Sequence, residues 1–153
     1  MLAFADREAI CELLQSTAAL LDEEKFDEWL ALFDEHALYD LCTYSPEIRR
    51  SMSWWKCDRA TLATQLKEVP QHVRDPARRR HIVGFPVLKL DGERASAVSS
   101  FAVYRTTPEG RTSVFIVGRY EDALVKKSGR WLYVAHRAIA DTRMLDSFTH
   151  LPI

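Results

Sequence analysis

The order of two hydrophobic patterns along the chain is the feature that most constrains its fold. Residues 6–23 repeat apolar side chains at three- and four-residue steps, the period of an amphipathic helix, with Asp6 as the expected N-cap. From residue 81 onward the chain changes to strand-like runs separated by turn residues. Helices followed by an antiparallel meander are typical of an α+β fold. We therefore predict one α+β domain over residues 1–153, a length that suits a single hydrophobic core.

Further elements follow from local patterns and turn signals. Residues 25–33 and 58–69 are predicted as helices, the second capped by Asp58. Residues 37–43 are predicted as a first strand, and residues 44–56, which show no period, as a long loop or an interrupted strand. The later strands are expected at residues 81–90, 94–106, 112–126 and 130–143, with bends or bulges at Gly84, Pro86 and Gly118.

The charge balance excludes several classes of partner. Lysine and arginine total 21 against 22 acidic residues, so no strong field favours nucleic acid or a membrane surface. The basic run at residues 78–80 lacks interleaved aromatic residues, and we expect it to be a solvated or interface surface. The sequence has no apolar run of the roughly 20 residues that span a bilayer and no basic start followed by an apolar stretch. We expect a cytoplasmic protein.

The sequence shows no motif for a cofactor or a metal. Its 5 glycines are isolated, which excludes both the dinucleotide fingerprint and the P-loop. The cysteines, Cys11, Cys42 and Cys57, form no C-x-x-C pair, and we expect reduced thiols that pack rather than react. No histidine forms an H-x-D or H-x-E step or lies four residues from another histidine. We therefore predict no metal site and no cofactor site on this chain.

Three polar residues are the candidates for a pocket. His81 is the first choice, because an imidazole on a strand, next to Arg80, could point into a cavity walled by the sheet. Tyr39 and Asp40, on the predicted first strand, could reach the same cavity. A purely structural histidine and a hydrogen-bonded rim remain open as the alternative interpretations.

The apolar pattern of two expected strands indicates that the protein binds another protein chain. Residues 114–117 and 131–135 show no polar alternation, so both faces of these strands are expected to be covered. The helices can cover only one face, and the other is expected to meet another chain. The alternative is an internal pocket with an exposed apolar patch.

Three local strings, in order, resemble the small β subunit of bacterial aromatic-ring-hydroxylating dioxygenases. Residues 55–62 read W-K-C-D-R-A-T-L, similar to the D-R-A-T-L of that family, and residues 75–83 read D-P-A-R-R-R-H-I-V, similar to its D-P-x-R-x-R-H-hydrophobic-V. Residues 129–141 begin G-R-W and include Arg137 and Asp141, similar to its closing strand. With the opening helix, the resemblance extends over most of the chain.

The resemblance implies a cone-shaped, strongly curved antiparallel sheet with the N-terminal helices in its concave face. This cystatin-like fold is shared with nuclear transport factor 2, ketosteroid isomerase and scytalone dehydratase. It also implies a non-catalytic β subunit, packed as a trimer beneath three catalytic α subunits. The Rieske 2Fe-2S cluster and the mononuclear iron are then expected on the α subunit, and electrons come from NAD(P)H through separate proteins.

Two other functions remain open for the same fold. One is a cofactor-independent isomerase or dehydratase that uses His81, Tyr39 or Asp40 in a desolvated pocket. The other is a ligand-binding protein without turnover. The sequence does not separate these two.

Overall fold

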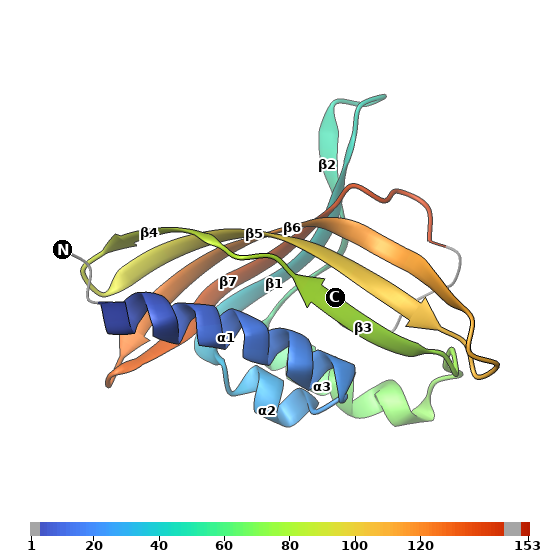
Figure 1. Cartoon of the computed structure of the whole chain (residues 1–153), viewed down its shortest axis with the longest axis horizontal. Coiled ribbons are helices and arrows are strands. Elements are labelled where there is room, and N and C mark those ends of the chain that lie inside the picture. Colours follow the sequence, from blue (N-terminus) through green and yellow to red (C-terminus); the bar gives the residue numbers. More distant parts are fainter. Residues whose placement is uncertain (1–3, 146–150) are drawn as a thin grey trace.

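The computed structural model describes residues 4–145 and 151–153 as three helices and one large sheet (Figure 1). No helix among these residues is long and apolar enough to cross a membrane. The helices are α1 (Phe4–Asp22), α2 (Phe26–Leu30) and α3 (Arg59–Glu68), followed by a 3-10 turn, η1 (Val69–Gln71). The strands are β1 (Phe33–Ser45), β2 (Arg50–Asp58), β3 (Arg78–Val83), β4 (Val87–Asp91), β5 (Arg94–Thr106), β6 (Thr112–Lys127) and β7 (Arg130–Ala140).

The sheet follows the order β2-β1-β7-β6-β5-β3, and β4 also pairs with β5. All three helices lie on one side of the sheet (Figure 1), which we call its inner face; the opposite side is the outer face. The predicted fold class, α+β with a curved sheet around N-terminal helices, is confirmed. The sheet is mixed rather than wholly antiparallel, because β1 runs parallel to β7. This pairing joins strands from the two halves of the chain, so local turn signals do not reveal it.

The long strands bend at irregular points in their pairing. The register shifts between Val103 and Tyr104 in β5 and between Ala123 and Leu124 in β6, as expected for bulges that add curvature. At Gly118 the backbone of β7 passes so close that a Cβ would lie 2.1 Å from the Ile139 carbonyl oxygen. The predicted strand 81–90 is interrupted and forms β3 and β4.

The structure confirms the predicted apolar face of the first helix and corrects its predicted start. Ile10, Leu13, Leu14 and Leu21 are buried as the spacing predicts. Asp6 is not the N-cap, because it already lies inside α1. Its carboxylate instead accepts hydrogen bonds from Lys126 Nζ (2.7 Å) and Trp131 Nε1 (2.9 Å), which fastens the helix to the β6–β7 hairpin.

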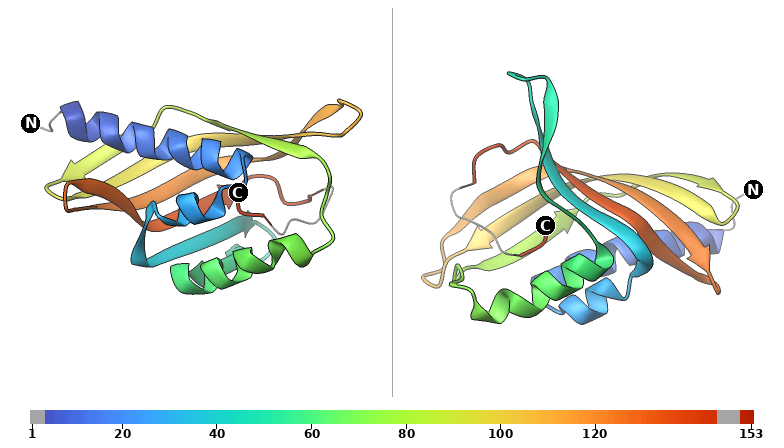
Figure 2. Two further views of the ribbon diagram at one scale, coloured as in Figure 1. Left: turned by 90° about the horizontal axis from the view of Figure 1, so that it is seen from below. Right: turned by 180° about the vertical axis from the view of Figure 1, so that it is seen from behind.

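The other short elements differ in length from their predictions. The helix predicted at residues 25–33 ends at Leu30, and Phe33 already begins β1. Asp58 caps α3 as predicted, since its Oδ1 accepts a 2.8 Å hydrogen bond from the Thr61 backbone N–H. Of the two alternatives predicted for residues 44–56, the long loop is wrong and the interrupted strand is close to the structure, since a turn at residues 46–49 separates β1 from β2. Residues 44–56 form most of a β1–β2 hairpin that projects from the body of the domain, as Figures 1 and 2 show.

Candidate functional site

The three pocket candidates divide between the two faces of the sheet. Tyr39 and His81 are buried on the inner face, beneath the helices. Asp40 follows Tyr39 in β1, and because successive strand residues point to opposite faces, it lies on the outer face. The structure therefore brings together no Tyr39–Asp40–His81 site, and the prediction that Asp40 reaches the same cavity is wrong.

His81 is held by an aspartate that the sequence analysis missed. Asp22, the last residue of α1, accepts hydrogen bonds from the His81 backbone N–H (2.9 Å) and from its ring Nδ1 (2.7 Å). The two side chains are 6% and 1% exposed, respectively. Arg80 approaches the same carboxylate at 3.6 Å. Asp22 thus fixes the imidazole with its proton on Nδ1 and joins the end of α1 to β3.

The hydroxyl of Tyr39 is already engaged. It accepts a 2.9 Å hydrogen bond from the Ile153 backbone N–H, and both residues are fully buried. Burial raises the pKa of Tyr39 well above its ordinary value, so the phenol stays neutral at physiological pH. Tyr39 can therefore act as a hydrogen-bonding group but not as an ionised base.

A second buried histidine–aspartate pair lies at the centre of the interior. His136 Nδ1, on β7, donates a 2.6 Å hydrogen bond to Asp122 Oδ1, on β6. Burial raises the pKa of Asp122, and the neighbouring imidazole opposes this shift. The aromatic rings around His136 lie with their centroids 4.8 to 6.4 Å from the imidazole and belong to Trp29, Phe33, Tyr39, Tyr120 and Tyr133.

A sequence signal for this pair exists but is indirect. Counting back from the turn at Ser128-Gly129 places Asp122 opposite Ala135. The bulge in the β6–β7 pairing moves the register by one residue and brings His136 opposite Asp122. Without knowledge of the bulge, the two residues fall on opposite faces of the sheet.

Chemically, the interior holds two imidazoles with the same arrangement. Each uses Nδ1 toward a carboxylate, which leaves the lone pair of Nε2 as a hydrogen-bond acceptor. His81 Nε2 and His136 Nε2 are buried and have no hydrogen-bond partner among the described residues. Either Nε2 could accept a hydrogen bond, but only from a molecule that enters the interior.

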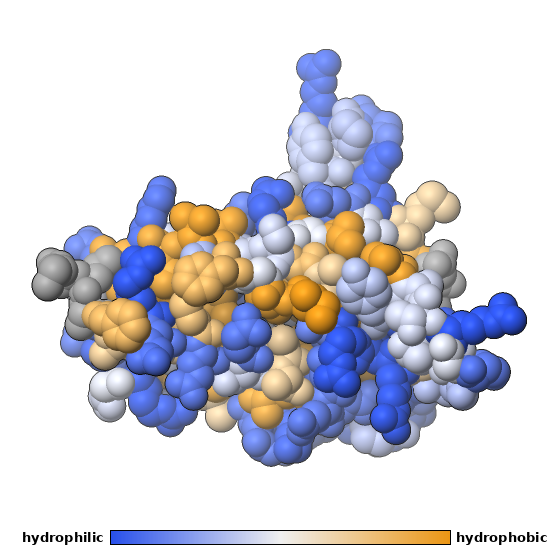
Figure 3. Space-filling model, in the orientation of Figure 1, coloured by the Kyte–Doolittle hydropathy of each residue, from blue (hydrophilic) through white to orange (hydrophobic). Residues whose placement is uncertain are grey.

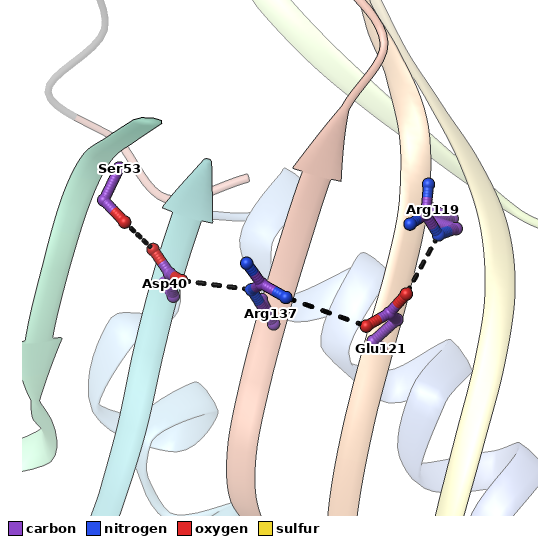
Figure 4. A network of polar contacts seen from close by, with 5 residues as sticks. All are labelled: Asp40, Ser53, Arg119, Glu121 and Arg137. Atoms are coloured by element: carbon purple, nitrogen blue, oxygen red, sulfur yellow. Dashed lines mark hydrogen bonds and ion pairs between the residues drawn. The ribbon is translucent and has the colours of Figure 1, made fainter. Parts of the chain in front are cut away.

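A chain of polar contacts crosses the outer face, where Asp40 lies (Figure 4). Asp40 accepts hydrogen bonds from Ser53 Oγ on β2 (2.8 Å) and from Arg137 Nε on β7 (3.2 Å). Arg137 also lies 3.8 Å from Glu121, which accepts a 3.0 Å hydrogen bond from Arg119 Nε on β6. We call these five residues the outer-face network. It links four strands and explains the position of Asp40.

No metal centre is formed by the described parts of the chain. Nowhere in residues 4–145 and 151–153 do three His, Cys, Asp or Glu side chains gather at ligand distance. Cys42 and Cys57 are separate thiols whose pKa values burial raises, which favours the protonated form. Of the basic run, Arg79 departs from the prediction, because its guanidinium packs 4.5 Å over the Phe115 ring.

Comparisons with known proteins agree over nearly the whole chain. The sequence profile of the SnoaL-like domain family matches residues 3–137. The β subunit of the methanesulfonate monooxygenase hydroxylase from Methylosulfonomonas methylovora is 31% identical over 156 residues, covering 95% of this chain and 86% of that protein. The 2-aminobenzenesulfonate 2,3-dioxygenase β subunit from an Alcaligenes species is 31% identical over 149 residues, covering 97% and 99%.

A solved structure agrees in fold. A β subunit from Novosphingobium aromaticivorans, assigned to the aromatic-ring-hydroxylating dioxygenases, superposes with a TM-score of 0.88 at 22% identity and covers 99% of both chains. Sequence and fold thus lead to one family. The chain belongs to the SnoaL-like domain family and, within it, to the small β subunits of bacterial aromatic-ring-hydroxylating dioxygenases.

Proposed function

We propose that this chain is a non-catalytic β subunit, which supports the assembly of catalytic α subunits in a multicomponent dioxygenase for aromatic compounds. The observation that carries the proposal is the 31% identity to two oxygenase β subunits over at least 95% of the chain. An oxygenase of this kind adds both atoms of O2 to an aromatic ring, and we place that reaction on the α subunit.

The inner face supports a structural role for this chain. An acid–base site needs groups that converge on space a substrate can enter. Here His81 is 1% exposed and bonded to Asp22, Tyr39 is bonded to Ile153, and Asp40 lies on the other face. These contacts join helix to sheet and fill the interior, so they favour the scaffold over an isomerase or dehydratase.

The described residues of this chain do not fit the cofactors of the proposed oxygenase. A Rieske cluster needs two cysteines and two histidines, and the mononuclear iron needs two histidines and a carboxylate. The described residues offer no cluster of three such ligands. We therefore place both centres on the α subunit, with electrons supplied from NAD(P)H by separate proteins, and propose that the complex works in the cytoplasm.

We propose the outer face as the contact surface for other subunits. Strands β1, β5 and β6 expose Leu38, Val98 and Val114 there, each between 43% and 51%. Apolar side chains also gather over β3, β4 and the segment between them (Figure 3), where Phe85 is 83% and Val87 69% exposed. Exposed apolar side chains that gather on one surface favour an interface, and we propose self-association as a trimer in addition to α-subunit binding.

Co-expression tests the proposal. The chain is produced together with a candidate large subunit that carries Rieske and iron-ligand motifs, and the complex is purified through a tag on the large subunit. We expect the two chains to co-purify in a fixed ratio and the mass from light scattering to match three copies of each. Failure to co-purify would overturn the proposal.

A matched activity assay separates the scaffold from the catalyst. Complexes carrying His81→Gln or Tyr39→Phe are expected to retain the kcat of the unaltered complex once assembled. A large loss of kcat with intact assembly and intact metal content would instead favour a catalytic role for the inner face.

A further inference from the structure

The β1–β2 hairpin carries large apolar side chains into solvent. We call residues 44–56 the arm, because they project from the body of the domain (Figures 1 and 2). Its large apolar side chains, each between 38% and 55% exposed, are Tyr44, Ile48, Met52 and Trp54. A two-stranded hairpin by itself is at best marginally stable in water, so an arm with this exposed apolar surface indicates a contact with another chain.

The arm is held in a fixed direction. Near its tip, Glu47 accepts a 2.8 Å hydrogen bond from Ser45 Oγ and 2.7 Å hydrogen bonds from Arg143 Nη1, which follows β7. Closer to the body of the sheet, Ser53 Oγ donates a 2.8 Å hydrogen bond to Asp40. A preorganised segment loses less conformational entropy on binding than a flexible one, so the arm suits docking.

The free edge of β2 is protected against the addition of another strand. A bulge interrupts its register with β1 between Leu41 and Cys42, and the charged residues Arg50 and Lys56 lie along the strand. Bulges and charged side chains on an edge strand are the usual means by which proteins prevent strand addition. The arm is therefore expected to bind through its side chains.

The opposite end of the sheet presents a second apolar surface. The strand order begins with β2 and ends with β3, and β4 continues the β3 edge, because both strands pair with β5. Along this edge Ile82, Phe85 and Val87 are more than half exposed, and apolar side chains gather there in Figure 3. We call these three residues the edge patch. The domain thus carries two different apolar surfaces at opposite ends of one sheet.

Helix α1 places carboxylates beside the edge patch. Gln15 Nε2 donates a 3.4 Å hydrogen bond to the Val83 carbonyl oxygen, so this face of the helix lies along the strand edge. Glu12 and Glu8, both exposed, lie three and seven residues before Gln15 and therefore on the same face. Lys89 of β4 points to the outer face of the sheet instead. A partner that packs from the helix side of the edge therefore meets negative charge.

The arm carries the opposite charge. Its basic residues are Arg49, Arg50 and Lys56, against one acidic residue, Glu47. The same division extends over the chain, because residues 1–36 hold 10 acidic and 2 basic residues although the whole chain is nearly neutral. Two arms would repel each other, whereas an arm and the α1 side of an edge patch attract. A second copy of this chain therefore supplies both the apolar surface and the charge that the arm needs.

We propose that the arm of one copy binds the edge patch of a second copy, with Arg49 and Arg50 beside Glu8 and Glu12. The contact is heterologous, since two different surfaces meet, and repeated contacts of this kind close into a ring or continue as a filament. The inference rests on the self-association in the proposed function and adds the surfaces that meet and their chemistry. It leaves the outer-face network available to the α subunit.

Mixing two variants tests this inference. Ile48→Asp with Met52→Asp alters the arm and keeps the edge patch, and Phe85→Lys with Val87→Lys alters the edge patch and keeps the arm. Each variant alone is expected to sediment as a monomer in analytical ultracentrifugation, where the unaltered chain forms an oligomer. An equimolar mixture should form a dimer and nothing larger, because one intact arm then meets one intact edge patch.

Val73→Asp and Val73→Lys are the matched controls, at a side chain that is 96% exposed and outside both surfaces, and the oligomer should persist in both. A mixture of the two variants that stays monomeric would overturn the inference, as would an unaltered chain that is monomeric or an oligomer that survives either variant. These outcomes are independent of co-purification with the large subunit, on which the proposed function depends.

Charge reversal covers the case in which the apolar variants do not fold. Arg49→Glu with Arg50→Glu should raise the Kd of self-association by at least about tenfold, because carboxylates then face carboxylates. Adding Glu8→Lys with Glu12→Lys to the same chain should restore much of the affinity. Lys67→Glu reverses an exposed charge on α3 and should leave the Kd unchanged. No weakening by the first pair, or no recovery with the second, contradicts the inference.

Discussion

His136 Nδ1 lies 2.6 Å from Asp122 Oδ1, and both side chains are at most 1% exposed. A buried pair of this kind contributes little net stability, because desolvation offsets most of its attraction. Loss of one partner is different, since the remaining polar group then stays buried without its hydrogen bond. The stability of the fold is therefore expected to be especially sensitive to substitutions at this pair.

Replacing one member of this pair should be far more damaging than replacing both. We expect His136→Phe to lower the free energy of unfolding by about 3–5 kcal/mol, measured by urea denaturation. The double variant with Asp122→Leu, which removes both polar groups, should recover much of that loss. Equal losses in the single and double variants would show that packing, not the pair, determines the effect.

The pH dependence of His136→Phe gives a second signature of the same pair. Burial raises the pKa of Asp122, and the variant removes the imidazole that opposes this shift. A carboxyl whose folded pKa lies above its unfolded value contributes stability at low pH that is lost as the pH rises through the folded pKa. The variant should consequently be more stable at pH 4 than at pH 7, relative to the unaltered protein.

Local signals in the sequence predict most of the secondary structure. Strand β5 begins at Arg94 and ends at Thr106 as predicted, because turn residues delimit both ends. For the β1–β2 hairpin the sequence left a long loop or an interrupted strand open, because the turn, with Arg49 at φ +52°, has no glycine to mark it. The parallel pairing of β1 with β7 depends on contacts across the chain, so no local pattern contains it.

At the candidate site, too, the sequence predicts local strand positions but not contacts between residues that are far apart in the chain. The placement of Tyr39 on the inner face is consistent with its strand position. The partners of the two buried histidines were not predicted. Asp22 is 59 residues from His81 in the sequence, and a bulge shifts the β6–β7 register by one residue before Asp122 pairs with His136. The contact of Tyr39 with Ile153 spans 114 residues and has no sequence signature.

The ion pair between Asp75 and Arg105 of β5 predicts a specific loss of stability in acid. Asp75 receives hydrogen bonds from Arg105 Nε (2.5 Å) and Nη2 (2.6 Å), and these lower the pKa of Asp75 from 3.8 to about 2. A lowered folded pKa gives stability that is complete above the unfolded pKa and is lost as the pH falls through the folded one. The contribution is about 2 kcal/mol at neutral pH.

Asp75→Asn should remove that contribution and flatten the stability curve between about pH 4 and pH 2. Chemical denaturation at a series of pH values measures the effect. Asp91→Asn, at an exposed carboxylate at the end of β4, is the matched control and should leave the curve unchanged. A curve for Asp75→Asn that matches the unaltered protein would rule out the ion pair as the cause.

Gly118 is required by the close approach of β6 and β7. A Cβ at this position would lie 2.1 Å from the Ile139 carbonyl oxygen and 2.9 Å from Ala140 Cα, both backbone atoms that move only with the strand. We expect Gly118→Ala to cost at least about 3 kcal/mol of unfolding free energy. Gly84→Ala, whose nearest contact would be an ordinary 3.5 Å, should cost less than about 1 kcal/mol. Similar losses in the two variants would contradict the steric explanation.

The outer-face network allows assembly to be tested separately from folding. Arg137 bridges Asp40 and Glu121 and is 38% exposed, so Arg137→Gln should change the stability of the isolated chain by no more than about 1 kcal/mol. If this face binds another subunit, loss of a charge that becomes desolvated there should weaken the complex at least tenfold. Titration of the variant against the purified large subunit measures the change.

Lys25→Gln supplies the matched control for that titration. Lys25 pairs with Glu23 at 2.7 Å on the helical side of the domain, and both side chains are at least 50% exposed. The variant removes one positive charge, as Arg137→Gln does, but away from the proposed contact surface, so its affinity for the large subunit should equal that of the unaltered chain. Equal affinity for Arg137→Gln would place the subunit contact away from this network, while equal weakening by both variants would indicate a general effect of charge.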